Sequence, residues 1–287
     1  MATRPPGDLS HLERLLRAWV DETNEQTAAR ARALVAVTVV AQMLDGLRDF
    51  DGKHLFAFKG GAGLQMRFGS RARATKDLDA AYREDMDLMV EQVTAAVAQG
   101  WSGFTGRITN VEPITRAGVS PAPIRMKIKL QYRRRNFMTL PFEVSAAEAS
   151  SVDEPELVPI AVSLEPLQLQ GPEELPFLPL RYQIAQKLHA CSEPSTDGST
   201  NDRARDLADL DLIEDLAVDD DDFPPIRQAC VEIFDARQMH PWPPFIAAAA
   251  GWEAIWADLA AKNGLEMTLE QAIATANAFV ERIDAAR

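Results

Sequence analysis

The segment that begins at Lys59 restricts the possible folds of this chain more than any other stretch. An apolar run, Leu55 to Phe58, leads into Gly60-Gly61 and predicts a buried strand that ends at a tight turn. Residues 62–68 are predicted to form a helix whose free N–H groups face that turn, where a phosphate group is favoured. The sequence therefore predicts a strand, a glycine turn and a phosphate-binding helix.

Two aspartates, Asp77 and Asp79, follow the predicted helix with Leu78 between them. Residues two apart on a strand point to the same face, so both carboxylates are expected to project together. Two like charges this close repel each other unless a cation lies between them. Carboxylate oxygens suit Mg²⁺, which proteins usually hold with one or two carboxylates and the phosphates of a substrate. The combination indicates chemistry on a nucleoside triphosphate (NTP).

This segment resembles the opening of the polymerase-β-type nucleotidyltransferase fold, and more narrowly the AbiEii-type toxins of bacterial toxin–antitoxin pairs. The matching letters are KGGAGL at 59–64 and RATKDLD at 73–79. Two later blocks occur in family order: IAQKLHA at 184–190 resembles the family's AxKLHA helix, and RARDLADL at 203–210 resembles its RxxDLxDL segment. The family usually has Thr where this chain has Ala62, and often Ser where it has Thr75.

The resemblance implies an α/β (α+β) fold: a nucleotidyltransferase core with a mixed sheet, followed by a C-terminal helical domain. Asp77 and Asp79 would bind Mg²⁺ and act in catalysis, and Asp209 and Lys187 would join them. The expected nucleotide-binding residues are those that let the backbone approach the triphosphate, donate to a phosphate or neutralise its charge: Lys59, Gly60, Gly61, Thr75 and Lys187.

Glu143 is the candidate for a third catalytic acid, because two-metal transfer clamps both the attacking and the leaving oxygen. It lies in an apolar strand segment, Leu140 to Ser145, and the family carries an acidic residue in a comparable strand. The alternative is a solvated charge on an edge strand, which Pro141 favours.

Other charged residues have simpler interpretations. Lys187 could lie on a solvated helix face, and His189 is more typical of a structural histidine than of a base. Asp206 and Asp211 are interpreted as part of a solubilising helix face.

The charge of the chain is unevenly distributed. The net charge is −13, yet residues 59–135 hold 14 Lys and Arg against 7 Asp and Glu. A basic segment around the predicted site favours a phosphate chain as partner; the alternative is that it balances the acidic remainder through an internal contact. The predicted RNA-binding residues are Arg71, Arg73, Arg133, Arg134 and Arg135.

Periodicity predicts two domains, residues 1–165 and 166–287. The first should contain helices near 11–21, 26–47 and 86–98 and paired strands within 124–144, with a turn at 133–136. A proline-rich connection is expected over 153–179, and helices over 180–192, 202–216, 224–237, 245–261 and 269–286.

The resemblance thus implies a cytoplasmic toxin-like nucleotidyltransferase that transfers NMP from an NTP to RNA, with tRNA as the first candidate acceptor, and blocks translation and growth. It also implies a cognate antitoxin as the protein partner. No membrane partner is expected, because no apolar run is long enough to span a bilayer, and no export signal is visible. Two cysteines without metal or disulfide spacing favour a reducing compartment. The alternatives are modification of a protein hydroxyl, a regulator that binds nucleotide or RNA without catalysis, and a helical interaction protein.

Overall fold

The computed structural model describes residues 4–23, 27–114, 121–194 and 201–286. The chain divides into two compact units, Met1–Leu178 and Pro179–Arg287. The sequence placed this boundary after residue 165, within the proline-rich connection. The division comes later because that connection contains two strands that belong to the sheet of the first unit.

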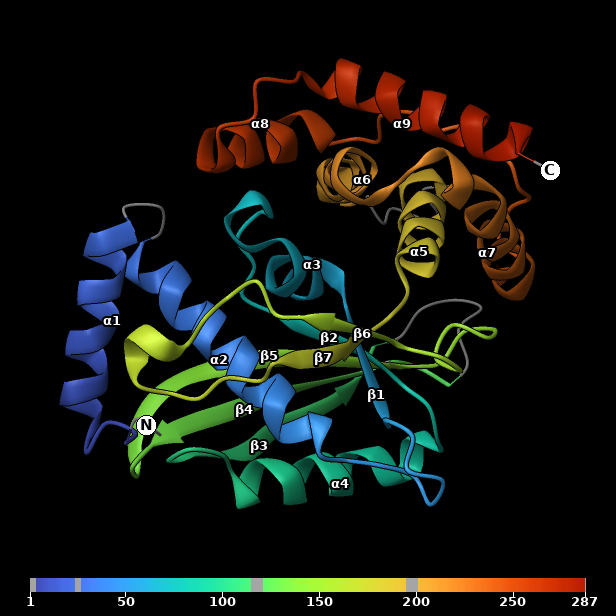
Figure 1. Ribbon diagram of the computed structural model, residues 1–287. Helices are drawn as coiled ribbons and strands as arrows, with labels where there is room; N and C mark the ends of the chain where they lie inside the picture. The colour runs from blue at the N-terminus through green and yellow to red at the C-terminus, as the bar shows by residue number, and fades with distance from the viewer. Residues whose placement is uncertain (1–3, 24–26, 115–120, 195–200, 287) are drawn as a thin grey trace. The chain divides into compact units, whose positions relative to one another are not determined.

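The first unit is built on a mixed sheet with the strand order β3-β4-β5-β2-β1-β7-β6 (Figure 1). β2 is parallel to β5 and β1 is parallel to β7, whereas the other neighbours are antiparallel. The strands are β1 (Phe56–Lys59), β2 (Leu78–Tyr82), β3 (Phe104–Pro113), β4 (Ile124–Tyr132), β5 (Arg135–Ala146), β6 (Glu156–Pro159) and β7 (Glu174–Phe177).

Helices α2 and α4 cover one face of this sheet and contact each other. α2 is apolar on most of its surface, so it is buried along nearly its whole length. α3 follows β1 directly and packs on β1 and β2. The helices are α1 (Leu9–Thr23), α2 (Ala28–Asp45), α3 (Gly60–Phe68) and α4 (Met86–Gln99), with short 3₁₀ turns at Gly69–Arg71 and Glu165–Leu167.

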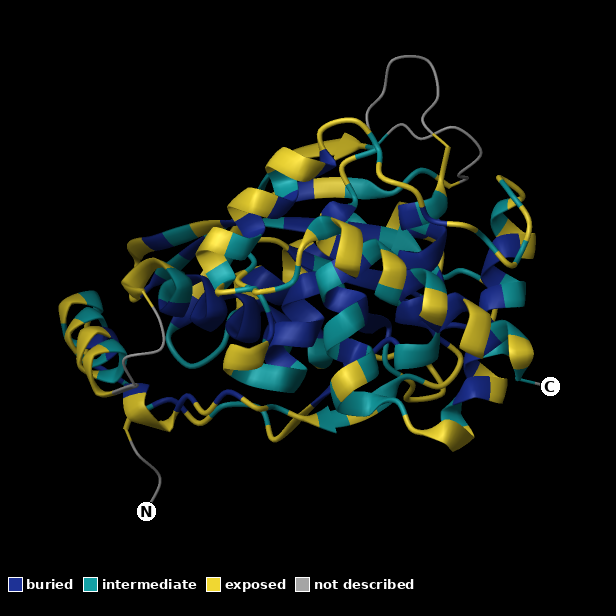
Figure 2. Ribbon diagram, turned by 90° about the horizontal axis from the view of Figure 1, so that it is seen from above, coloured by how far each residue is buried: buried dark blue, intermediate teal, exposed yellow. Residues whose placement is uncertain are grey.

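The hairpin of β4 and β5 shows how the sequence pattern separates the two faces of the sheet. Met126, Ile128 and Leu130 are buried in the core under the helices. Their neighbours Lys127 and Lys129 point to the opposite face, as alternation requires. We call this opposite side of the sheet the polar face. Figure 2 shows the buried residues in dark blue along the strands and the exposed ones in yellow on the outer turns of the helices.

Three strands were not predicted. β3 contains Gly106 and only weak alternation, because much of it is exposed. β6 and β7 lie at the end of the sheet, where prolines such as Pro159 and Pro176 are tolerated.

The second unit is helical within the part that the structure describes (Figure 1). The expected helix over 245–261 begins only at Trp252. Asn277 explains the difference, because its side-chain amide accepts from the N–H of Ile246 (2.9 Å) and donates to its carbonyl (2.9 Å), holding that segment outside a helix. The helices are α5 (Leu180–Ser192), α6 (Ala204–Ala217), α7 (Phe223–Arg237), α8 (Trp252–Asn263) and α9 (Leu269–Ala285), with a 3₁₀ turn at Asp220–Asp222. No helix in the described ranges is long and apolar enough to cross a bilayer.

Candidate active site

The turn between β1 and α3 depends on a glycine. Gly60 has φ +67°, a conformation that a residue with a Cβ rarely adopts. A Cβ at this position would also collide with the carboxylate of Asp79. The absence of a side chain therefore lets the Asp79 carboxylate lie directly against the backbone at the start of α3.

The next residue, Gly61, accommodates a cation in the same way. A Cβ built on Gly61 would lie 3.1 Å from the nearest nitrogen of the Arg73 guanidinium. Arg73 had been predicted to bind RNA, and the structure places it over the first turn of α3. The turn therefore has an anionic carboxylate on one glycine and a guanidinium on the next.

A row of four charged residues crosses the polar face. Lys59 pairs with Asp79 across β1 and β2, Asp79 pairs with Glu143 across β2 and β5, and Glu143 pairs with Arg125 across β5 and β4. Paired residues on neighbouring strands are about 5 Å apart and share a face. The sheet register thus brings together residues far apart in sequence in the order cation, acid, acid, cation, which we call the charged row.

The two outer cations are held by the strand that carries Glu143. Lys59 donates from Nζ to the hydroxyl of Ser145 at 2.8 Å. Arg125 donates from Nε to Glu143 at 2.7 Å, with a second nitrogen at 2.5 Å. Glu143 therefore lies in the row, beside Asp79, and is not a solvated charge on an edge strand.

Asp77 lies one residue before β2, whereas the sequence had placed it on the strand. It is more exposed than Asp79. The pKa of Asp77 is raised, first by partial desolvation and then by the Glu143 carboxylate, while Arg125, Arg73 and Lys76 oppose the shift. The pKa of Asp77 is therefore shifted by the charges of Glu143 and Arg125 in the charged row.

The carboxylates of the site favour an open divalent-metal site over a closed one. Among the described residues, no three His, Cys, Asp or Glu side chains are grouped closely enough to form a closed metal centre. Mg²⁺ does not require one, because it keeps waters and shares its ligands with substrate phosphates. The carboxylates of Asp77, Asp79 and Glu143 are of the ligand type that such an open, substrate-completed site uses, so their chemistry is compatible with Mg²⁺.

In the second unit, Lys187 forms a buried cluster with two aspartates. Its Nζ lies 2.7 Å from Oδ1 of Asp206 and 2.7 Å from Oδ2 of Asp209. The side chains of Lys187 and Asp209 are 9% and 2% exposed, so this lysine is not on a solvated helix face. Asp206 is also buried, which contradicts its interpretation as a solubilising residue. We call these three residues the buried triad.

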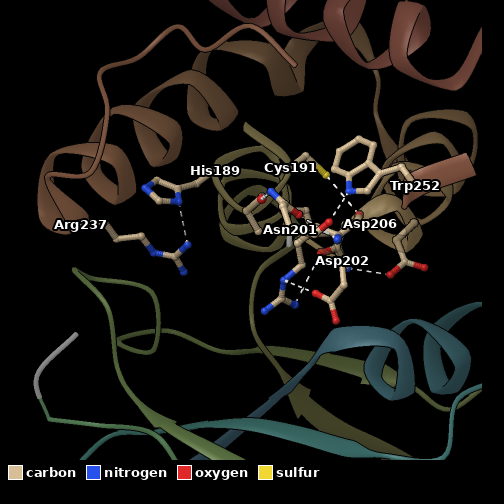
Figure 3. Close-up of polar contacts among 11 residues, drawn as sticks. His189, Cys191, Asn201, Asp202, Asp206, Arg237 and Trp252 are labelled. Atoms are coloured by element: carbon tan, nitrogen blue, oxygen red, sulfur yellow. Dashed lines mark hydrogen bonds and ion pairs between the residues drawn. The ribbon is translucent and has the colours of Figure 1, made fainter. Parts of the chain in front are cut away.

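The entry to α6 is tied to the end of α5, which fixes the aspartates of the triad (Figure 3). The side-chain amide of Asn201 donates to the carbonyl of Ala190 at 2.9 Å and accepts from the N–H of Arg203 at 2.9 Å. Trp252 donates from its indole to the carbonyl of Asn201 at 2.6 Å. These bonds hold α6 so that two carboxylates one turn apart face the same lysine.

His189 has a structural environment. It is buried, its ring lies 4.9 Å from that of Phe234 and 4.4 Å from that of His240, and its Nδ1 lies 3.3 Å from Arg237 (Figure 3). These contacts agree with the expectation that it is not a base.

The remaining predicted residues lie at different places in the first unit. Thr75 is half-buried between α3 and β2, and Arg71 is exposed in the 3₁₀ turn after α3. Arg133, Arg134 and Arg135 are exposed at the turn between β4 and β5. Eight residues separate Glu143 from Arg135 along β5, or about 26 Å at 3.3 Å per residue. The arginine turn is thus remote from the charged row.

Comparison with known proteins decides the family. The sequence model described as "Nucleotidyl transferase AbiEii toxin, Type IV TA system" matches residues 42–282, which is most of the chain. The chain belongs to the AbiEii nucleotidyltransferase toxin family. It is a nucleotidyltransferase of the toxin type, and the resemblance drawn from its three motifs is confirmed.

One of two similar solved structures supports the fold. MenT4, a nucleotidyltransferase toxin from Mycobacterium tuberculosis H37Rv, is 18% identical with a TM-score of 0.55, over 96% of this chain and 99% of that chain. A candidate nucleotidyltransferase from H. pylori is 15% identical with a TM-score of 0.46, over 88% of this chain and 92% of that chain. A search of curated proteins finds no match. The predicted mixed α/β nucleotidyltransferase fold is confirmed.

Sequence reasoning did not find Arg125, Ser145 or the role of Asp206. Arg125 and Ser145 are recognisable only through strand register, which no short motif encodes. Asp206 lies three residues before Asp209, and that helical spacing was the available signal.

Proposed function

We propose that this AbiEii-family protein transfers NMP from an NTP to an RNA hydroxyl, with tRNA as the first candidate acceptor, and thereby blocks translation and growth. The observation that carries the proposal is the charged row, in which Asp79 lies against Gly60 at the start of α3 and beside Glu143. This places acid ligands next to backbone N–H groups that favour a phosphate.

The residues of the first unit would have two roles, metal binding and triphosphate binding. Asp77, Asp79 and Glu143 would hold Mg²⁺, which supplies charge neutralisation at the α-phosphate and at the leaving group. Gly60 and Gly61 would let the triphosphate approach the backbone of α3, and Lys59, Arg73 and Thr75 would contact its oxygens. The resemblance of their segments to the family's motifs supports a further role for Lys187 and Asp209 of the second unit in nucleotide binding and catalysis.

In the proposed reaction, the oxygen of the acceptor hydroxyl attacks the α-phosphorus in line. The bond between the α-phosphorus and the bridging oxygen breaks, and pyrophosphate leaves. The hydroxyl proton passes to solvent, and the product is an RNA extended by one nucleotide unit. Electrostatic positioning is the main contribution that such a site makes.

The family's type IV toxin–antitoxin designation supports a cognate antitoxin as partner. We propose that expression of this chain arrests growth and that co-expression of the antitoxin relieves the arrest.

The test is incubation of the protein with each labelled NTP, Mg²⁺, total RNA and total protein. Label is expected in RNA for the wild type and for Asp51→Asn, an exposed control outside the row, and not for Asp79→Asn. Label in protein instead would replace RNA by a protein hydroxyl as acceptor. Absence of label in either, while NTP still binds, would favour a non-catalytic regulator.

A further inference from the structure

The polar face carries a second charge pattern, next to the charged row. Lys127 and Lys129 follow Arg125 at alternate positions of β4, so all three share that face. Arg107 on β3 pairs with Lys129 and therefore lies beside it. We call Arg107, Lys127 and Lys129 the basic track.

All three side chains of the basic track are positively charged. Acidic partners in this register occur only at its inner end, where Glu112 and Glu143 both pair with Arg125. Beyond that point Lys127 pairs with Thr109 and Pro141, and Lys129 pairs with Arg107 and Thr139, so none of these register partners is acidic.

The cations of the track are available to a ligand. Lys127 and Arg107 are exposed and Lys129 is half-buried. Among the ion pairs of the described residues, none involves these three side chains. A single solvated lysine is ordinary on a protein surface. Three neighbouring cations on a chain of net charge −13 are different, because they create a local positive potential on a protein that is negative overall.

The track also has a direction. It begins at the charged row and ends at the β4–β5 turn, where Arg133, Arg134 and Arg135 are exposed. From Arg125 to Arg133 the strand advances about 26 Å at 3.3 Å per residue. At about 3.4 Å per stacked nucleotide, this length corresponds to roughly eight nucleotides.

We propose that the basic track binds the phosphate backbone of the RNA acceptor strand, whose reactive end lies at the charged row and whose body runs along β4 toward the arginine turn. The inference rests on the proposed function, and it names the surface that holds the acceptor. It also gives a reason for the distance between the arginine turn and the acids, because an extended strand spans both. Phosphate contacts of this kind position RNA without reading its sequence.

The experiment measures affinity for unstructured RNA of 4, 8 and 16 nucleotides across a salt series. The variant is Arg107→Gln/Lys127→Gln/Lys129→Gln, and the matched control is Arg14→Gln/Arg17→Gln/Lys53→Gln, which removes three exposed cations of the same unit. Each single-strand phosphate contact contributes about −0.7 to the slope of log affinity against log salt. We expect the track variant to flatten the slope by about 2 for 8 and 16 nucleotides, and the control to leave the slope unchanged.

A second variant tests the far end of the track. Arg133 and Arg134 both have positive φ, so Arg133→Asn/Arg134→Gly/Arg135→Gln keeps a sequence that suits the turn. It should weaken binding of 16 nucleotides and leave 4 nucleotides unaffected.

The proposal is overturned if wild type and track variant give parallel salt lines, or if the control loses as much slope as the track variant. Folding of each variant is checked by its unfolding midpoint. The binding assay needs no turnover, so its outcome is separate from that of the transfer assay. If RNA binds through the basic track but is never labelled, the proposed transfer activity is wrong and the track is retained. If RNA is labelled but the track variant has the same salt dependence of RNA affinity as the wild type, the track is wrong and the transfer activity is retained.

Discussion

Replacing Lys187 by Met should destabilise the helical unit far more than the loss of one surface lysine. In the wild type, Nζ of Lys187 lies 2.7 Å from a carboxylate oxygen of Asp206 and 2.7 Å from one of Asp209, so one cation forms ion pairs with two carboxylates. Methionine keeps the length and the apolar stem of the side chain but removes the charge. Two buried carboxylates then lose the cation that lies between them, while Arg203 remains 3.8 Å from Asp206.

The size of the effect follows from burial. The side chains of Asp206 and Asp209 are 12% and 2% exposed, so water cannot replace the missing cation. Removing one partner of a buried ion pair costs about 3–5 kcal/mol. At about 4 °C per kcal/mol for a domain of this size, the unfolding midpoint should fall by roughly 12 °C or more.

Thermal unfolding followed by circular dichroism measures the midpoint, and a second variant separates stability from function. In Lys187→Met/Asp206→Asn/Asp209→Asn no charge remains in the triad, so most of the lost stability should return. NTP affinity of this folded, neutral variant is then the informative quantity. If Lys187 contacts the triphosphate, affinity falls although the unit is folded.

Two results would refute this reasoning. An unfolding midpoint of Lys187→Met equal to that of the wild type would mean that the lysine does not hold the carboxylates in the folded protein. Wild-type NTP affinity in the neutral variant would show that the triad is structural and that Lys187 does not grip the nucleotide.

Three further predictions concern the first unit. Gly60→Ala should lower the free energy of unfolding by more than about 1 kcal/mol, because Gly60 has a positive φ and an added Cβ would collide with Asp79. This loss should be smaller when Asp79 is also replaced by Ala, and equal losses in both backgrounds would exclude the collision. In the metal-free protein Asp77 should protonate at a higher pH than the ordinary pKa of 3.8 implies, because partial burial and the Glu143 carboxylate disfavour its charged form; a carboxyl titration without Mg²⁺ that follows the ordinary value would contradict this. Arg125→Gln frees Glu143, so half-maximal activity should require less Mg²⁺, and an unchanged Mg²⁺ dependence would remove Glu143 from the metal site.

The sequence predicted the parts of the fold that local pattern encodes. α5 begins and ends where periodicity placed it, at Leu180 and Ser192, because its apolar spacing is unbroken and Pro179 precedes it. β3 was not predicted, since an exposed strand with a glycine has little alternation to detect. β6 and β7 were missed because each has only four residues and contains a proline, and this moved the unit boundary.

The candidate site was predictable to the extent that motifs carry it. The glycines and the aspartates lie within one short segment, residues 60–79, so their geometry follows from a strand, a turn and a helix. Glu143 and Arg125 depend on the parallel pairing of β2 with β5 and the antiparallel pairing of β5 with β4. The register of β4 with β5 is set by their hairpin turn, which the sequence did predict, whereas the pairing of β2 with β5 joins strands far apart in the chain and no local pattern specifies it.

The charged row makes a last prediction about how metal and nucleotide binding are coupled. Lys59 and Arg125 flank Asp79 and Glu143, so the row alone is close to neutral and attracts a triphosphate weakly. With Mg²⁺ at the carboxylates the row becomes positive, and NTP and metal should each raise the affinity of the protein for the other by the same factor. Asp79→Asn/Glu143→Gln leaves only the cations, so this variant should bind metal-free NTP more tightly than the metal-free wild type while losing transfer. Calorimetric titration with and without Mg²⁺ measures both quantities. Weaker metal-free binding by the variant would mean that the two acids contact the nucleotide by some route other than a shared cation.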